Sequence, residues 1–382
     1  TQYAVNHTEN MTFKASVKPI KSLRIDLSAD RNLMENRTSN LGIGDNNSFA
    51  LLNNQFNGSF STSTISWKTA FSQDIMNDTT LSNQIWENLL SYRSEISSIM
   101  SQSNPNASNN LENTGYYSGY DSTQQDVIIG AFICAYLGES PTLNNINPLS
   151  QRIPLPNWRV TFDGLGKIKA FKKYIKKLSF THAYRSNFSL GNYTTNLNGQ
   201  WDNEGNATET DISGNFISQK QIMTMNILEQ FAPLLGADLT LSNNMSVKFE
   251  IKKDRNISLS LSNNQITEIK GSEIKFGSGY TWRKLSLPIK IAGKTLDPSD
   301  LRMRLDVAVR DNKTIIRKIV ENQNQYTAGQ TAVTIQFSGD YNLTKQLMLR
   351  IYFDRRVNTP HVSTSFATAN TNAGFALRFQ LR

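Results

Sequence analysis

Residue types that catalyse reactions or hold metals are few in this chain, and they are widely spaced. The three histidines, His7, His182 and His361, are far apart, and none has a partner at metal-ligand spacing. The one cysteine, Cys134, lies in the apolar run VIIGAFICAYLG, where a buried and unreactive thiol is expected. No Ser/His/Asp set and no carboxylate pair stands in a supporting context. We therefore expect no enzyme activity, no metal and no cofactor.

An acidic loop, WDNEGNATETD, has a spacing that loosely resembles a calcium loop, with oxygen ligands at Asp202, Glu204, Asn206, Glu209 and Asp211. It lacks the terminal Glu and the flanking helices of an EF-hand. We therefore expect a solvated surface loop. The glycines of LGIGD lack a following Lys and helix, so a phosphate-binding loop is not expected either.

The densest basic segment is KIKAFKKYIKK, which contributes to a formal net charge of +9. Two interpretations stay open for it: a short interfacial helix at the periplasmic side of a membrane, or a solvated basic hairpin turn. Nucleic acid is not an expected partner, because no aromatic platform or recognition helix accompanies the charge. The residues of this periplasmic basic turn are Lys167, Lys169, Lys172, Lys173, Lys176 and Lys177.

Apolar and polar residues alternate with a period of two along much of the chain, which predicts β-strands as the elements that carry these features. Between residues 301 and 310, apolar and mostly charged side chains alternate, so one face of the strand is apolar and the other is charged. We expect the apolar set to face lipid and the charged set to face a wet lumen. The lipid-facing candidates are Leu301, Met303, Leu305, Val307 and Val309; the lumen-facing candidates are Arg302, Arg304, Asp306 and Arg310.

The same alternation recurs along the chain, with short and long connections in turn. It predicts about twelve strands: 10–18, 22–37, 55–70, 157–165, 177–193, 219–232, 244–262, 268–282, 299–320, 326–341, 346–358 and 370–382. The connection 233–244 is expected to be a short turn. No apolar run is long enough for a transmembrane helix. The predicted fold is all-β, an antiparallel transmembrane β-barrel portion with a small helical insert.

The insert breaks the strand pattern. Apolar residues at intervals of three and four predict an amphipathic helix over about 77–101, with Asp78 as its N-cap, and a second helix over 124–137. The chain then divides into barrel strands at 1–71, an insert at 72–156 and barrel strands at 157–382. Such an insert is expected to cover a barrel mouth or to lie in the lumen. The strand directions on either side of it do not match, which predicts a missing crossing or an insert that threads the lumen.

The last segment, GFALRFQLR, alternates aromatic and apolar residues with others up to the C-terminus. Bacterial outer-membrane barrels commonly close on such a strand. The closing-strand candidates are Phe375, Leu377, Phe379 and Leu381.

Several long strings in this chain resemble one family. They are LPNWRVTFDGL, THAYRSNFSLGNYTTN, EQFAPLLGADLTLSNNMSVKFEIKKDRNISLSLSNNQITEI, DNKTIIRKI and LRIYFDRRVNTPHVSTSFATANTNAGFALRF. The strings WKTAF and QDVIIGAFICAYLG also fit. They look like the C-terminal part of the SprA/Sov family, the outer-membrane translocon of the type IX secretion system of Bacteroidetes. The resemblance covers residue 55 to the end closely and the first fifty residues more loosely.

This resemblance implies a barrel of about thirty-six strands, of which the chain supplies roughly the last dozen. It also implies a location in the bacterial outer membrane, and export of folded cargo that bears a conserved C-terminal domain, including adhesins in gliding species. The implied partners are the rest of the same barrel, a PorV-like shuttle barrel, a periplasmic plug protein, the cargo and outer-membrane lipids. Two other interpretations stay open: a diffusion porin or nutrient receptor, and a secreted β-sandwich adhesin.

Overall fold

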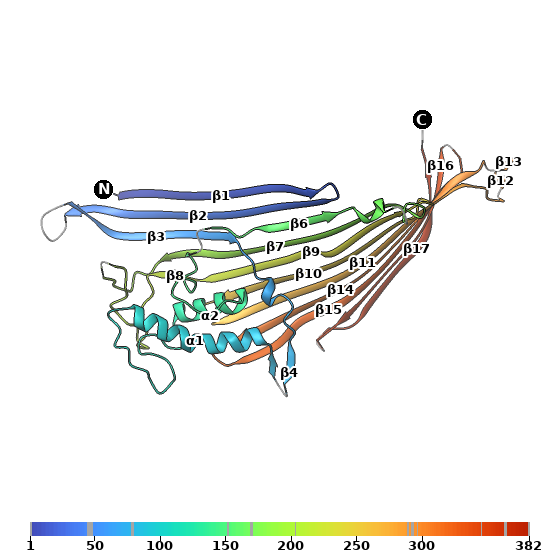
Figure 1. The fold of residues 1–382 in the computed structure, drawn as a ribbon. Coiled ribbons are helices and arrows are strands. Elements are labelled where there is room, and N and C mark those ends of the chain that lie inside the picture. Colours follow the sequence, from blue (N-terminus) through green and yellow to red (C-terminus); the bar gives the residue numbers. More distant parts are fainter. Residues whose placement is uncertain are drawn as a thin grey trace.

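One antiparallel sheet of 13 strands dominates the computed structural model, with two helices on one of its faces (Figure 1). The structure describes residues 2–43, 49–77, 80–150, 153–168, 171–202, 204–288, 290–291, 294–295, 297–344, 346–362 and 365–380. The predicted all-β class, antiparallel sheet and small helical insert are confirmed.

Each of the twelve predicted strands has a counterpart. The strands of the sheet are β1 Gln2–Ile20, β2 Leu23–Ile43, β3 Phe49–Ser63, β6 Asn157–Phe162, β7 Ile175–Thr195, β8 Lys220–Ile222, β9 Thr224–Leu241, β10 Ser246–Ser260, β11 Gln265–Leu285, β14 Ser299–Lys318, β15 Gln323–Asn342, β16 Leu347–Pro360 and β17 Thr368–Phe379. Two small hairpins, β4 Ile75–Asn77 with β5 Thr80–Ser82 and β12 Lys290–Ile291 with β13 Lys294–Thr295, lie outside it. The main strand order is β1-β2-β3-β7-β9-β10-β11-β14-β15-β16-β17, so β1 and β17 are its two edges.

The strands β3 and β6 share a single place in the sheet. Residues 31–43 of β2 pair with β3, and residues 23–28 of β2 pair with β6. On the other side, β7 pairs with both pieces in the same way. Both pieces are antiparallel to β2, so they run in one direction and together make one crossing. The mismatch of strand directions in the sequence therefore comes from an insert that leaves the sheet in the middle of a strand and returns to complete it.

The insert begins directly after β3. Ser63 closes the gap in the strand, because its carbonyl oxygen accepts a 3.0 Å bond from the amide of Leu155 and its hydroxyl donates to the carbonyl of Leu155 at 2.6 Å. The predicted strand to residue 70 is wrong at this end, since β3 ends at Ser63 and Trp67–Thr69 form a single 3-10 turn.

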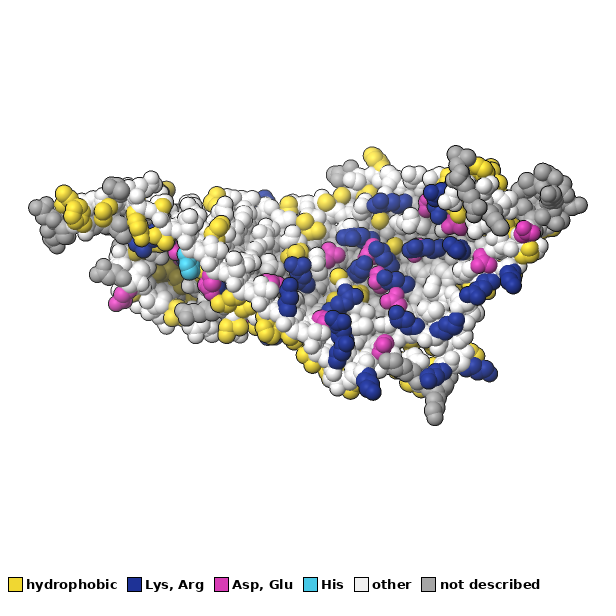
Figure 2. Space-filling view, turned by 90° about the horizontal axis from the view of Figure 1, so that it is seen from above, with side chains coloured by type: hydrophobic (Ala, Val, Ile, Leu, Met, Phe, Trp, Pro, Cys, Tyr) yellow, Lys and Arg dark blue, Asp and Glu magenta, His cyan; other side chains and the backbone are white. Residues whose placement is uncertain are grey.

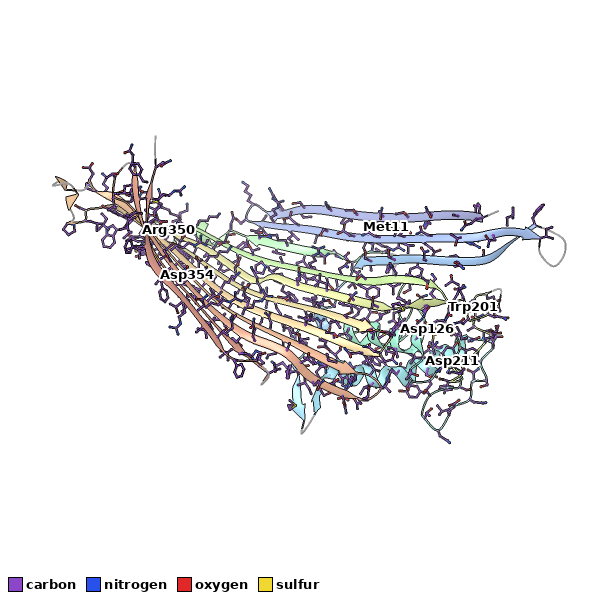
Figure 3. All side chains as sticks on the ribbon, turned by 180° about the vertical axis from the view of Figure 1, so that it is seen from behind. Met11, Asp126, Trp201, Asp211, Arg350 and Asp354 are labelled. Carbon is purple, nitrogen blue, oxygen red and sulfur yellow. The ribbon has the colours of Figure 1, made fainter. Side chains whose placement is uncertain are left out.

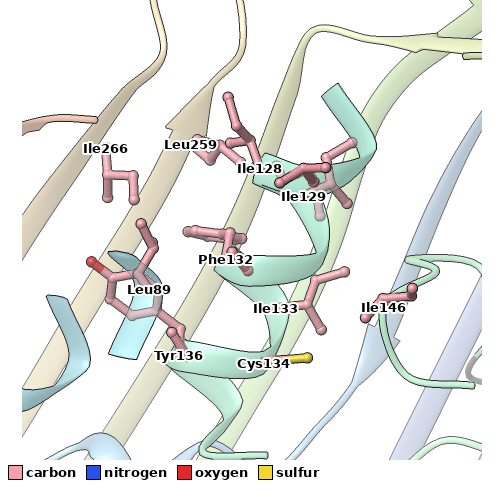
Figure 4. Close-up of a cluster of buried hydrophobic side chains, with 14 of the residues drawn as sticks. Leu89, Ile128, Ile129, Phe132, Ile133, Cys134, Tyr136, Ile146, Leu259 and Ile266 are labelled. Carbon is pink, nitrogen blue, oxygen red and sulfur yellow. The ribbon is translucent and has the colours of Figure 1, made fainter. Parts of the chain in front are cut away.

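Two helices form the body of the insert, α1 Gln84–Ser103 and α2 Gln125–Leu137. Asn83 caps α1, its side-chain oxygen accepting the amide of Trp86 at 2.8 Å, whereas the predicted cap, Asp78, lies outside the described residues. Every residue of α2 from Val127 to Leu137 is buried, packed between α1 and the sheet (Figure 4). Burial raises the pKa of the Cys134 thiol to about 12, as a structural thiol in a dry core requires. Within the described residues, no helix has the length and apolar character needed to cross a membrane.

The predicted turn at 233–244 is wrong, because β9 continues through it to Leu241. Ala232, Pro233 and Leu234 lie opposite the single residue Lys252 of β10, which makes a bulge. A proline cannot donate to the ladder, and a bulge is one of the places where a strand tolerates it. The predicted chain reversal begins at Pro233, whereas β9 runs on to Leu241.

Candidate functional site

The apolar half of one sheet face forms a continuous belt. The register places Leu305 beside Ser278 and Phe337, and Val307 beside Phe276 and Ile335, so all five lipid-facing candidates of β14 share a face with apolar residues of both neighbours. The same face carries Phe375, Leu377 and Phe379 of β17, opposite Ile351, Leu349 and Leu347. We call this the apolar belt; its further members include Phe13, Val17, Ile25, Val160, Phe180, Leu239, Phe249 and Ile274.

The belt has the dimensions of a bilayer core. From Leu301 to Val309 it spans nine residues of β14, which matches the ~9–11 residues with which a tilted strand crosses a bilayer. Many of its large side chains are exposed, Phe375 by 75% and Ile274 by 50%. An exposed apolar surface of this extent needs a cover that the described chain does not supply.

The opposite face, which we call the charged face, carries the lumen-facing candidates. Arg304 donates to Asp306 at 2.5 Å, and Arg350 pairs with Asp340 of the adjacent strand at 2.7 Å. Arg310 lies 3.8 Å from Asp254 and Arg302 is exposed. Figure 2, which looks onto the sheet from the side away from the helices, shows basic and acidic side chains interspersed over its middle. Mixed charge of this kind suits a water-filled surface.

The insert sits on the same face as the apolar belt. Ile257 and Leu259 of β10 pack against the helices, and they share a face with Ile251 and Phe249 of the belt because β10 pairs with β11 without a bulge. The sheet face therefore has two parts, a belt towards the end with β12 and β13 and an insert-covered part towards the other end (Figure 1). A belt that faces lipid and an insert that lies in the lumen are thus mutually exclusive.

Between these two parts, a buried ion pair holds the start of the insert. Arg255 of β10 donates to Glu229 of β9 at 2.6 Å, and it also donates to the carbonyls of Ser66 at 2.9 Å and Thr69 at 3.1 Å. Glu229 accepts bonds from the hydroxyls of Ser66 at 2.7 Å and Tyr184 at 2.8 Å. Both charges are thus neutralised and hydrogen-bonded, as burial demands.

A second buried cluster fixes the insert two strands further along. Arg317 of β14 donates to Glu268 of β11 and to Asp74 of the insert, both at 2.6 Å. Lys270 lies 2.7 Å from Asp74 and 2.9 Å from Glu268, so two cations meet two carboxylates. The hydroxyl of Tyr136, in α2, also donates to Glu268, and burial raises the pKa of Tyr136 well above its ordinary value.

Sequence reasoning missed both clusters. The signal was present, since Arg255 has the same parity as Ile251 and Ile257, and Glu268 the same parity as Ile266 and Ile274. A charge in an apolar register predicts a buried partner. The partners came from strands and an insert far away in sequence, which periodicity cannot identify.

The basic turn lies at the end of the sheet opposite the insert. It contains one 3-10 turn at Leu165–Lys167 and hydrogen-bonded turns at 171–174, so within the described residues the interfacial helix is not formed. Lys176 donates to Asn244 at 2.5 Å, and the ammonium of Lys173 lies 5.6 Å from the ring centroid of Tyr174. Lys172 and Lys177 are exposed, Lys169 lies outside the described residues, and Lys167 is described by its backbone alone.

The remaining residues singled out in the sequence lie in the acidic loop and at the closing strand. Asp202 accepts the amides of Glu204 and Asn206 at 3.0 and 2.8 Å, and hydrogen bonds led by the Asn206 side chain lower the pKa of Asp202. Within the described residues, no cluster of His, Cys, Asp and Glu could hold a metal. Figure 3 places Asp126, Trp201 and Asp211 at the opposite end of the molecule from Arg350 and Asp354. Leu381 of the closing-strand set lies outside the described residues.

Comparisons with known proteins add little. No family model and no curated protein matches the chain. Among solved structures, the chain is similar to in-vitro folded OmpT, an outer membrane protein of Vibrio cholerae in its trimer form, with 10% identity over 99% of each chain and a TM-score of 0.23. An overlap at that TM-score carries no argument about fold or function.

Proposed function

We propose that this chain is part of the wall of a protein-conducting outer-membrane channel, the translocon of the type IX secretion system. In this proposal the apolar belt faces lipid, the charged face lines the lumen, and folded cargo with a conserved C-terminal domain passes along it. In gliding species the cargo would include adhesins. The chain would act passively, with gating by a PorV-like shuttle and a periplasmic plug.

One observation carries the proposal: a single apolar belt runs across the sheet, backed by a charged face, and ends at β1 and β17, each paired on one side only among the described residues. The exposed aromatic residues of β17 stand at one of these edges, and β1 stands at the other. A sheet with free edges needs strands from elsewhere to close it, because unpaired edge groups cannot be left in lipid. The sequence resemblance to the SprA/Sov family supports a large barrel that supplies them.

The two faces can be tested at neighbouring residues of one strand. Photo-crosslinking residues would replace Gln336, on the charged face, or Ile335, on the apolar belt, in the full-length protein in cells. A type IX cargo caught in transit should crosslink at position 336 and not at 335. Both variants must first be shown to reach the outer membrane.

Two outcomes would overturn the proposal. Equal crosslinking to cargo at both positions would mean that the apolar belt is not covered by lipid. Absence of cargo adducts at 336, Arg302 and Arg350, in protein that has assembled in the outer membrane, would exclude this face from the export path. Conduction of small solutes by the chain reconstituted without any other segment would instead favour a diffusion porin.

A further inference from the structure

The first segment of the insert exposes large apolar side chains next to the belt. Trp67 is 51% exposed, Phe71 49%, Ile75 62% and Met76 60%, within ten residues of sequence. Elsewhere in the insert, α2 buries every residue from Val127 to Leu137, and the exposed apolar residues Leu111, Leu143 and Ile153 are far apart in sequence. These four side chains are therefore the densest group of exposed apolar side chains in the described insert, and they need a cover.

The neighbours of Trp67 and Phe71 place these two side chains at the end of the apolar belt that borders the insert. The ring of Trp67 meets that of Trp158, on β6, edge-on at 6.0 Å between centroids, and Phe71 meets Phe231 of β9 at 5.4 Å. The ammonium of Lys253 lies 4.4 Å from the centroid of the Phe71 ring. Lys253 directly follows the belt on β10, between Ile251 and the buried Arg255. Trp67 and Phe71 thus lie where the belt gives way to the ion pairs, and Asp74, the residue before Ile75, is bonded to Arg317 in the second cluster.

The composition of this segment suits the boundary between hydrocarbon and lipid headgroups. Aromatic residues gather at that boundary in membrane barrels, and lysines extend past them to reach anionic groups. Here an exposed Lys68 follows Trp67, and Lys253 is stacked on Phe71. The hairpin of β4 and β5 projects away from the sheet (Figure 1).

We propose that the segment Trp67–Met76 is an interfacial ledge that rests on the lipid surface around the barrel. This inference depends on the proposed function, because it takes the apolar belt to face lipid. It then follows from the shared face that the insert is a collar on the outer wall of the barrel, and not a plug in its lumen. The occupant of the exposed apolar surface is the headgroup and upper acyl region of the bilayer.

The test measures contact between Trp67 and lipid in the full-length protein in bilayers. Vesicles would contain phosphatidylcholine brominated either near the headgroup or near the bilayer centre, and the signal of Trp67 would be the quenching lost in Trp67→Phe. We expect quenching by the shallow bromines to exceed that by the deep bromines about twofold, as for a side chain buried a few ångströms into the interface. Trp282, which is 52% exposed on the belt face, serves as the reference through Trp282→Phe.

Variants separate the ledge from the rest of the insert. Met76→Asp and Ile75→Asp should lower the shallow quenching of Trp67, whereas Leu111→Asp, at a 64% exposed position between α1 and α2, should leave it unchanged. If Trp282 is quenched and Trp67 is not, the ledge is wrong and the lipid-facing belt stands. If neither is quenched, the proposed function fails together with the ledge. An unchanged Trp67 signal in both aspartate variants would also overturn the ledge.

Discussion

The two halves of one sheet face differ in what covers their side chains. In the belt half, β14 presents Leu305 and Val307 with no cover from the chain itself. In the insert half, the same strand presents Ile315 and Arg317, both fully buried, and Arg317 is bonded to Asp74 of the insert. The backbone and the alternation are the same in both halves. The halves differ in whether the insert covers them: the belt half carries apolar residues, and the insert half carries apolar residues together with buried charges.

The difference shows how charge is handled where water is absent. The belt half excludes charge from nearly the whole face, as a lipid environment requires. The insert half accepts charge in pairs, with Arg255 on Glu229 and with Arg317 and Lys270 on two carboxylates. Such buried pairs do not have to raise stability. In the second cluster, a displaced insert would take Asp74 away from Arg317 and Lys270, so this cluster favours one arrangement of insert and sheet.

Removing a partner from the second cluster should give the largest effect. Arg317→Met leaves Glu268 and Asp74 with Lys270 alone, so we expect a loss of about 3–5 kcal/mol in the stability of the docked insert. Hydrogen exchange of the α2 amides in the full-length protein measures this opening. The double variant with Glu268→Leu restores the balance of Lys270 with Asp74 and should recover much of the loss. If the single and double variants exchange equally fast, charge balance does not hold the insert.

A charge placed in the belt should have the next largest effect. Leu305→Lys, at mid-belt, is expected to cost about 2–4 kcal/mol in membrane assembly, because an ammonium would be placed in hydrocarbon. Arg304→Gln, its neighbour on the charged face, is the matched control and should assemble normally. The fraction of folded protein in outer membranes, followed by resistance to denaturation in detergent, measures both. Equal tolerance of the two changes would argue against a lipid-facing belt.

Loss of the N-cap of α1 should have a smaller effect, confined to the insert. Asn83→Ala removes the bond to the Trp86 amide and a 2.7 Å bond from its side chain to Asp74, and should cost about 1 kcal/mol. Exchange of the first-turn amides of α1 measures the change, with the exposed Gln102→Ala at the other end of the helix as control. If the amides of the sheet also exchange faster, the insert and the sheet unfold as one unit. The belt half and the insert half would then not differ in how they are stabilised.

Periodicity predicted most of the fold, because alternation is a local signal. It located every long strand, both helices and the two faces of β14, since each follows from residues close in sequence. Periodicity failed at Pro233, because a β-bulge accommodates a residue that usually ends a strand. It also failed at β3 and β6, which together form one crossing although the insert separates them in sequence. Pairing across such a gap depends on contacts such as Ser63 with Leu155, which no local pattern records. The partners of Arg317 and Arg255 were hidden for the same reason.

The smallest effect is expected from an ion pair that resembles the buried ones in geometry. Arg350 lies 2.7 Å from Asp340 on the charged face, nearly the 2.6 Å of Arg317 and Glu268, but its side chain is 52% exposed while that of Arg317 is not exposed at all. Water and salt screen the exposed pair, so loss of Arg350 leaves Asp340 in contact with water and not buried without a partner. Arg350→Gln should therefore leave assembly and hydrogen exchange unchanged within error, at low and at high salt. A loss comparable to that of Arg317→Met would show that the charged face is packed against protein and not open to water, and the assignment of this face to a wet lumen would then be wrong.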